Sequence, residues 1–170
     1  PFLAPPASPA PPEGTEPSTL ELTSTAFGRR EEIPEDHSCD GDDISPPLSW
    51  SGPPDGTQSL ALIMDDPDAP MGTWVHWVLY NVPPDRRSLP EGVAADEQLS
   101  GGGFHGKNSW QRHGYGGPCP PSGSSHRYVF TLYALDAELD LEAGATKGKL
   151  LGAMDGHVLA QGELIGTYTR

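Results

Sequence analysis

Two short segments that are apolar on both faces most constrain the fold of this chain. Residues 74–80 (WVHWVLY) and 128–135 (YVFTLYAL) carry apolar side chains at odd and even positions alike. Strands with this pattern are covered by other layers of structure on both sides. The sequence therefore predicts a sheet inside packed layers, and residues 74–80 are the candidate for the middle of that sheet.

The remainder of the chain favours short strands and turns. Its 170 residues include 20 Pro and 21 Gly with 35% hydrophobic residues, which suits one turn-rich domain. Further strands are expected at residues 20–24, 59–64 and 162–168. Residues 45–50 should form a turn or an edge strand, because two prolines interrupt a central ladder there. Carboxylates and a proline at residues 65–68 should end the strand before them.

The segment after residue 136 has a helical pattern. Thr146 is a candidate N-cap, and Leu150, Leu151, Met154 and Val158 recur at helical spacing. The sequence therefore predicts one or two short helices near the C-terminus.

The first 18 residues differ in composition from the rest. Residues 1–18 contain seven prolines among Ala, Ser, Glu and Thr, so they cannot bury enough surface to fold. We expect a disordered tether at 1–18, followed by a single domain at 19–170. Such tethers often connect an export signal or a lipid anchor to a domain. This favours an extracytoplasmic location, with the cytoplasm as the alternative.

The charge balance excludes one class of partner. Twenty-four acidic residues against ten Lys and Arg give a formal net charge of −14. This charge repels a phosphate backbone, so nucleic-acid binding is not expected, and the acidity is interpreted as a solvated surface. No segment approaches the roughly 18 apolar residues of a membrane-spanning helix, so no membrane span is expected.

Two cysteines, Cys39 and Cys119, each lie in a Gly- and Pro-rich segment. They have no CxxC pairing and no histidine at zinc-finger spacing, which argues against a structural zinc site. Two alternatives stay open, free buried thiols and a disulfide. In the chain-entropy model a bridge would stabilise the fold by roughly 4.5 kcal/mol.

Histidines and carboxylates on the apolar strands are candidate functional residues. His126 and Tyr128 share one face of their strand, and His76 lies in the other apolar strand. If these strands are neighbours, the two imidazoles converge within about 12 Å, close enough to share one small phosphate. Asp66 and Asp68 leave a strand end and could join them. Taken singly, such histidines are more often core residues, and such aspartates are more often turn formers.

A long loop at residues 99–125 is rich in Gly, Ser and Pro but also contains His, Trp and Tyr, which is typical of functional loops. Its residues 114–121 could roof a cleft over the histidines. A hydrolytic reading would combine the histidines and aspartates as a metal or acid–base site with a serine nucleophile. GxSxG and HExxH motifs are absent, so this reading is the least favoured. The candidate nucleophiles would be Ser109, Ser122, Ser124 and Ser125.

Four motifs occur in a characteristic order: SPPLSW at 45–50, DDPDAP at 65–70, WVHW at 74–77, and GGPCPP at 116–121 with HRY at 126–128. With them, the chain from about residue 19 to residue 170 resembles the phosphatidylethanolamine-binding protein family, in its bacterial Raf-kinase-inhibitor-like branch. The resemblance implies a mainly β fold, in which a large central antiparallel sheet packs on a smaller sheet. It also implies a pocket at one end that binds phosphate-like anions and phospholipid head groups.

The resemblance further implies which residues form that pocket, and it requires neither a cofactor nor a metal. The expected function is non-enzymatic binding of a phosphate-bearing or zwitterionic small ligand. The alternative is a protein-interaction role, as an inhibitor of a kinase or a serine protease. An imidazolium or a tyrosine hydroxyl in the pocket would donate to a phosphate oxygen. The expected pocket residues are Asp66, Asp68, Trp74, His76, Pro120, Pro121, His126 and Tyr128.

Overall fold

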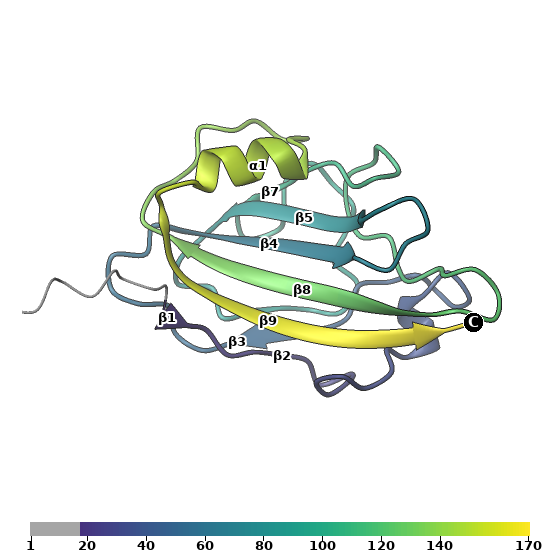
Figure 1. Ribbon diagram of the computed structural model, residues 1–170. Coiled ribbons are helices and arrows are strands. Elements are labelled where there is room, and N and C mark those ends of the chain that lie inside the picture. Colours follow the sequence, from purple (N-terminus) through teal and green to yellow (C-terminus); the bar gives the residue numbers. More distant parts are fainter. Residues whose placement is uncertain (1–17) are drawn as a thin grey trace, which may run out of the picture.

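The structure is a computed structural model that describes residues 18–170, and its main feature is a six-stranded sheet (Figure 1). In spatial order its strands are β1 (Ser18–Thr19), β9 (Val158–Thr169), β8 (Ser125–Leu135), β4 (Ser59–Asp66), β5 (Trp74–Val82) and β7 (Phe104–His105). A smaller sheet contains β2 (Leu22–Thr23), β3 (Leu48–Trp50) and β6 (Ser88–Leu89). The helices are η1, a 3-10 turn at Glu35–His37, and α1 (Lys147–Met154). The expected mainly β fold with two sheets is confirmed.

Both faces of the large sheet are covered, as the apolar strands indicate. The smaller sheet lies on one face and α1 on the other (Figure 1). Alternation along β5 serves both layers: Trp77 and Leu79 belong to the core on the side of the small sheet, whereas Val78 and Tyr80 pack in the cluster that includes Leu150 of α1. Each of these side chains is fully buried. The sheet is therefore the middle of three layers.

Two expectations about the large sheet are wrong. β8 and β4 occupy its middle, and β5 has only the two-residue β7 outside it. A strand buried on both faces is covered above and below, but this says nothing about its lateral position. The sheet is also mixed, because β1 runs parallel to β9 while the other pairs are antiparallel.

Several strand boundaries differ from the sequence expectations. β4 continues through Asp65 and Asp66, because the proline that interrupts the ladder comes only after them. β3 is the central strand of the small sheet, since both prolines of the motif precede its first residue. The strand expected at 20–24 is reduced to β2. β1 begins at Ser18, within the expected tether, whose other residues lie outside the described part of the chain.

One α-helix forms near the C-terminus. The hydroxyl oxygen of Thr146 accepts a hydrogen bond from the backbone N–H of Lys149, as expected for an N-cap, and Leu150 and Met154 are buried. Val158 does not continue the helix but begins β9, because Gly156 turns the chain with a φ of +81°. The closing strand expected at 162–168 lies within β9, which begins earlier, at Val158.

His105 is a buried neutral histidine that makes the fold sensitive to acid. Its Nε2 accepts a hydrogen bond from Trp77 Nε1 at 3.1 Å, and its Nδ1–H donates to the Asp96 carbonyl at 2.6 Å. Burial lowers the pKa of His105, although the Asp96 carbonyl partly opposes this shift. At a pH below the ordinary histidine pKa, His105 therefore binds a proton in the unfolded chain more readily than in the folded protein.

We expect the free energy of unfolding to fall as the pH drops below about 6.5, by up to about 1.4 kcal/mol per pH unit for each such histidine. Urea unfolding at pH 7.5 and pH 5.5 measures this effect. His105→Gln keeps an amide oxygen as acceptor for Trp77 but cannot titrate, so its pH dependence should be shallower. An equal slope in the variant would show that His105 is not the group responsible.

Candidate functional site

A cleft of about 550 Å³ opens at the end of the large sheet where β4 ends and β5 and β8 begin. This end of the sheet lies beside the C-terminus of the chain (Figure 1). Its floor contains Asp66, His76 and His126. The turn between β4 and β5 forms one wall, and residues 110–119 of the long loop form another. Three neighbouring strands therefore supply the polar groups, and loops surround them.

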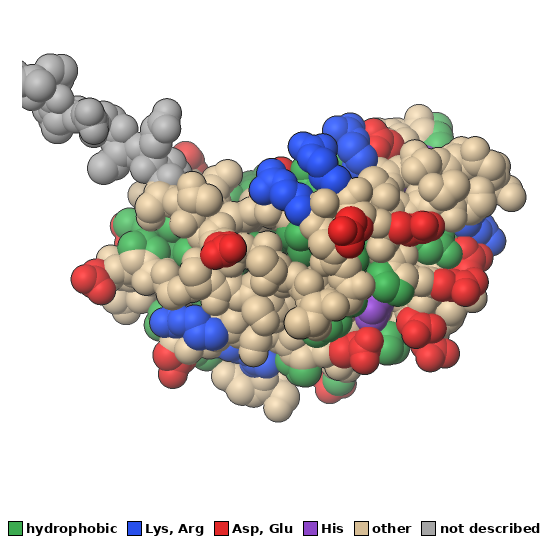
Figure 2. Space-filling view, turned by 90° about the horizontal axis from the view of Figure 1, so that it is seen from below, with side chains coloured by type: hydrophobic (Ala, Val, Ile, Leu, Met, Phe, Trp, Pro, Cys, Tyr) green, Lys and Arg blue, Asp and Glu red, His purple; other side chains and the backbone are tan. Residues whose placement is uncertain are grey.

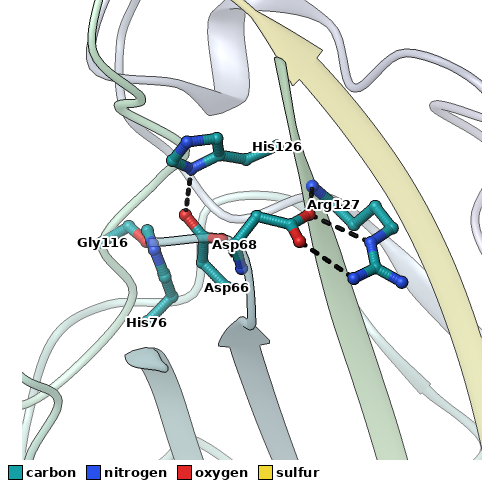
Figure 3. Close-up of polar contacts among 6 residues, drawn as sticks. All are labelled: Asp66, Asp68, His76, Gly116, His126 and Arg127. Carbon is teal, nitrogen blue, oxygen red and sulfur yellow. Dashed lines mark hydrogen bonds and ion pairs between the residues drawn. The ribbon is translucent and has the colours of Figure 1, made fainter. Parts of the chain in front are cut away.

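Asp66 and His126 form a buried pair at the floor (Figure 3). The distance from His126 Nδ1 to Asp66 Oδ2 is 2.6 Å, and the two side chains are 8% and 5% exposed. The other carboxylate oxygen accepts the backbone N–H of Asp68 at 2.8 Å. Because the carboxylate accepts, Nδ1 of His126 carries the hydrogen, and Nε2 is the ring nitrogen left for a ligand.

His76 is fixed in a similar way by a backbone carbonyl. Its Nδ1–H donates to the carbonyl of Gly116 at 2.7 Å. Burial lowers the pKa of His76, and the Gly116 carbonyl and the charge of Asp66 only partly oppose this effect. The ring is therefore neutral at pH 7, and its Nε2 is a hydrogen-bond acceptor.

Tyr128 lies beneath the floor and joins the two histidines. Its ring centroid is 5.2 Å from that of His76 and 6.5 Å from that of His126. The two imidazoles are therefore no further apart than the sum of these distances, which is within the expected limit. The Tyr128 hydroxyl is buried and has no hydrogen-bond partner among the described residues. Burial, reinforced by the charge of Asp66, raises its pKa, so it stays a phenol.

The two strands that carry the histidines are not neighbours. β5 and β8 are separated by β4, which carries Asp66 between them. Five of the eight expected residues nevertheless line the cleft: Asp66, Trp74, His76, Pro121 and His126. The histidines therefore converge across a carboxylate and not by direct strand pairing.

Three expected residues do not line the cleft. Asp68 forms a bidentate ion pair with Arg127 (2.9 and 3.0 Å), and these hydrogen bonds hold the pKa of its carboxyl at about 2. The chain leaves the strand at Pro67, so period-two alternation from Asp66 no longer applies to Asp68. Pro120 is buried, and Tyr128 is covered by the floor.

The sequence expectations missed much of the wall. Trp110 packs edge-on against Trp74 at 5.5 Å and against His76 at 5.0 Å. The Arg112 guanidinium lies 5.9 Å from the centre of the Trp110 ring and also lines the cleft. Met71, which is 97% exposed, is at the rim. The aromatic content of the long loop indicated its importance, but it could not show which residue contacts a histidine.

A disulfide joins Cys39 and Cys119 across the side of the cleft. Near it, the backbone N–H of Gly117 donates to Asp43 Oδ1 at 2.8 Å, and that of Cys39 donates to the Pro118 carbonyl at 3.0 Å. Both cysteines and Asp43 line the cleft. The loop around residues 39–43 and the long loop are therefore fastened into one wall.

Acidic groups dominate the charges near the cleft. On the face shown in Figure 2, Asp and Glu side chains gather at the right-hand end, which is the end that carries the cleft. Asp43 and Asp66 line the cleft itself, and Arg112 is the basic residue in its described lining. The field at the floor is therefore unfavourable for a bare polyanion.

The contacts of Ser109 and the arrangement of the His, Cys, Asp and Glu side chains give the hydrolase hypothesis no support within residues 18–170. Ser109 Oγ accepts the backbone N–H of Val75 at 2.8 Å and so fixes the loop to β5. Within residues 18–170 no group of three or more His, Cys, Asp or Glu side chains is placed to hold a metal ion. The same residues include no helix long and apolar enough to cross a membrane.

Comparison with known proteins identifies the family. Residues 23–169 match the family model described as phosphatidylethanolamine-binding protein. The chain belongs to this family. A UPF0098 protein of Methanothermobacter thermautotrophicus is 54% identical over 151 residues, which cover 89% of this chain and 99% of that protein. A UPF0098 protein of Aquifex aeolicus is 47% identical over 153 residues, covering 89% of each chain.

Solved structures of phosphatidylethanolamine-binding protein homologues share the fold. A putative homologue from Chlamydia trachomatis, CT736, superposes with a TM-score of 0.82 at 45% identity, covering 90% of this chain and 99% of that chain. YbcL of Escherichia coli, described as a new member of the mammalian PEBP family, gives a TM-score of 0.82 at 32% identity with the same coverage. These relatives support the bacterial branch that the motifs indicate.

Proposed function

We propose that this protein binds a small phosphate-bearing or zwitterionic ligand, such as a phospholipid head group, and does not transform it. The observation that carries this proposal is the pair of histidines at the floor of the cleft. His76 and His126 are each fixed through Nδ1 by an internal acceptor, and both line the cleft, where Nε2 is left for a ligand. Imidazoles held in this way are preorganised to bind and need no rearrangement.

The surrounding groups suit a ligand with both signs of charge. Arg112 at the cleft can accompany a phosphate, because a guanidinium donates to phosphate oxygens. The carboxylates of Asp43 and Asp66 favour an ammonium group nearby. Trp74 and Met71 add an apolar wall for the carbon part of such a ligand. Membership of the family supports a binding role of this general kind.

Replacing His126 by Asn should weaken binding of phosphoethanolamine by about 1.5–3 kcal/mol, the range for hydrogen bonds to charged groups. The Asn amide nitrogen takes the place of Nδ1 and can still donate to Asp66, so only the atom offered to the ligand is removed. Stability should therefore change much less than affinity. Isothermal titration calorimetry measures the affinity, and urea unfolding measures the stability.

His157 provides a matched control. Its Nδ1 lies 2.7 Å from Asp136 Oδ1, in an exposed pair at the opposite end of β8 and β9. His157→Asn makes the same chemical change away from the cleft and should leave the affinity unchanged. Full affinity in His126→Asn would contradict the proposal. Stoichiometric inhibition of a kinase or protease that is insensitive to His126→Asn would favour the protein-interaction alternative.

A further inference from the structure

The floor of the cleft contains a hydrogen-bond acceptor, Nε2 of His76, to which no group within residues 18–170 donates. His76 uses its single N–H on the Gly116 carbonyl, so Nε2 of the neutral ring can only accept. The His76 residue is 2% exposed, and burial keeps its pKa below the usual value. Within residues 18–170 no donor is bonded to Nε2. An acceptor that faces the cleft is costly to leave unpaired when a ligand displaces water from it.

The groups packed around His76 do not supply the missing donor. From β4, Asp65 and Asp66 contribute negative charge. From β8, Tyr128 and His126 approach, but within residues 18–170 the Tyr128 hydroxyl makes no hydrogen bond to His76, and His126 is bonded to Asp66. From the loop, Trp110 presents its ring edge-on. The donor for His76 therefore has to come from the ligand or from water.

We propose that the cleft selects ligands that bring a donor hydrogen to Nε2 of His76 while their phosphate oxygens bind elsewhere in the same cleft. This inference rests on the proposed function and specifies the chemistry of its ligand. Two groups provide such a hydrogen: the P–OH of a phosphate monoester in its monoanionic form, and the ammonium of an ethanolamine phosphate. A phosphate without either group would place an oxygen lone pair against the lone pair of Nε2.

Three small ligands separate these chemistries in calorimetric titrations of the wild-type protein at about pH 5.5. Methyl phosphate is mainly a monoanion with one P–OH there, because phosphate monoesters lose their second proton near pH 6. Dimethyl phosphate is also a monoanion but has no donor. Glycerophosphoethanolamine has an ammonium group and no P–OH. We expect at least one of the two donor-bearing ligands to bind about 10- to 150-fold more tightly than dimethyl phosphate.

Variants of His76 test whether its Nε2 causes this preference. His76→Asn keeps an amide N–H for the Gly116 carbonyl and removes the acceptor, so the preferred ligand should fall to the affinity of dimethyl phosphate. His76→Gln can place an amide oxygen near the position of Nε2 and should restore part of the preference. The affinity for dimethyl phosphate should rise in His76→Asn, because the lone pair of Nε2 that opposes its oxygens is removed.

The outcomes distinguish this inference from the function on which it rests. Equal binding of all three ligands to the wild type would overturn the selection by His76 but leave the proposed binding function standing. A preference that survives in His76→Asn would also overturn it. Failure of all three ligands to bind would overturn the proposed function itself, and with it this inference.

Discussion

Reduction of the Cys39–Cys119 disulfide should lower the thermal unfolding midpoint by roughly 9–18 °C. The bridge closes a chain segment with a sequence separation of 80 residues. In the chain-entropy model, a bridge that closes such a loop stabilises the folded state by about 4.5 kcal/mol. In a protein of this size, each kcal/mol of lost stability lowers the midpoint by about 2–4 °C. Both cysteines are exposed, so a reductant reaches them without unfolding.

Differential scanning calorimetry with and without a reductant measures this effect. The double variant Cys39→Ser with Cys119→Ser should melt at the temperature of the reduced protein and should not respond to the reductant. Two free thiols in the unreduced protein would refute the bridge. Disulfides persist in oxidising environments. If the protein is exported, the oxidising environment would therefore also keep this wall of the cleft intact.

Replacing Gly117 by Ala should destabilise the protein by about 2–4 kcal/mol and should also impair the cleft. A Cβ at this position would lie 2.2 Å from the carbonyl oxygen of His37, 2.4 Å from Asp43 Oδ1 and 3.0 Å from the Cα of Ser38. Two of these atoms belong to the backbone, so the loop itself has to move. Movement would also break the hydrogen bond from Gly117 to Asp43.

Urea unfolding and the calorimetric affinity for phosphoethanolamine report the two consequences of Gly117→Ala. Gly152→Ala is the matched control, because a Cβ at this helical, exposed position meets nothing within 4 Å. The control should stabilise the protein by about 1 kcal/mol, since alanine favours a helix over glycine. Unchanged stability and affinity in Gly117→Ala would mean that the two loops are not packed as described.

The strands of the fold could be predicted from local patterns, whereas their order could not. Alternation and apolar content identify the segments that become β4, β5 and β8. The pairing of Asp65 with Val129 and of Asp66 with Trp74 depends on register, which involves residues distant in sequence. That register places Asp66 between the two histidines, and the register cannot be predicted from any local sequence pattern.

The candidate site was predictable where residues lie on strands and less so where they lie on loops. Asp66, His76 and His126 follow from strand motifs, and the structure gathers them at one floor. Trp110 and Asp43 reach the cleft from loops, where side-chain direction depends on turns and on the disulfide. Sequence periodicity carries no information about such positions.

The chain enters and leaves the domain at opposite ends of the large sheet. Ser18 pairs with Ala160 near the start of β9, whereas the backbone N–H of Arg170, beyond its end, donates to the carbonyl of Ser124 beside the cleft. The ten residue steps from Ala160 to Arg170 span roughly 33 Å of extended chain. A biosensor surface or fluorescent label coupled through the residues before Ser18 would therefore leave the cleft facing the solution, whereas coupling after Arg170 would crowd its mouth.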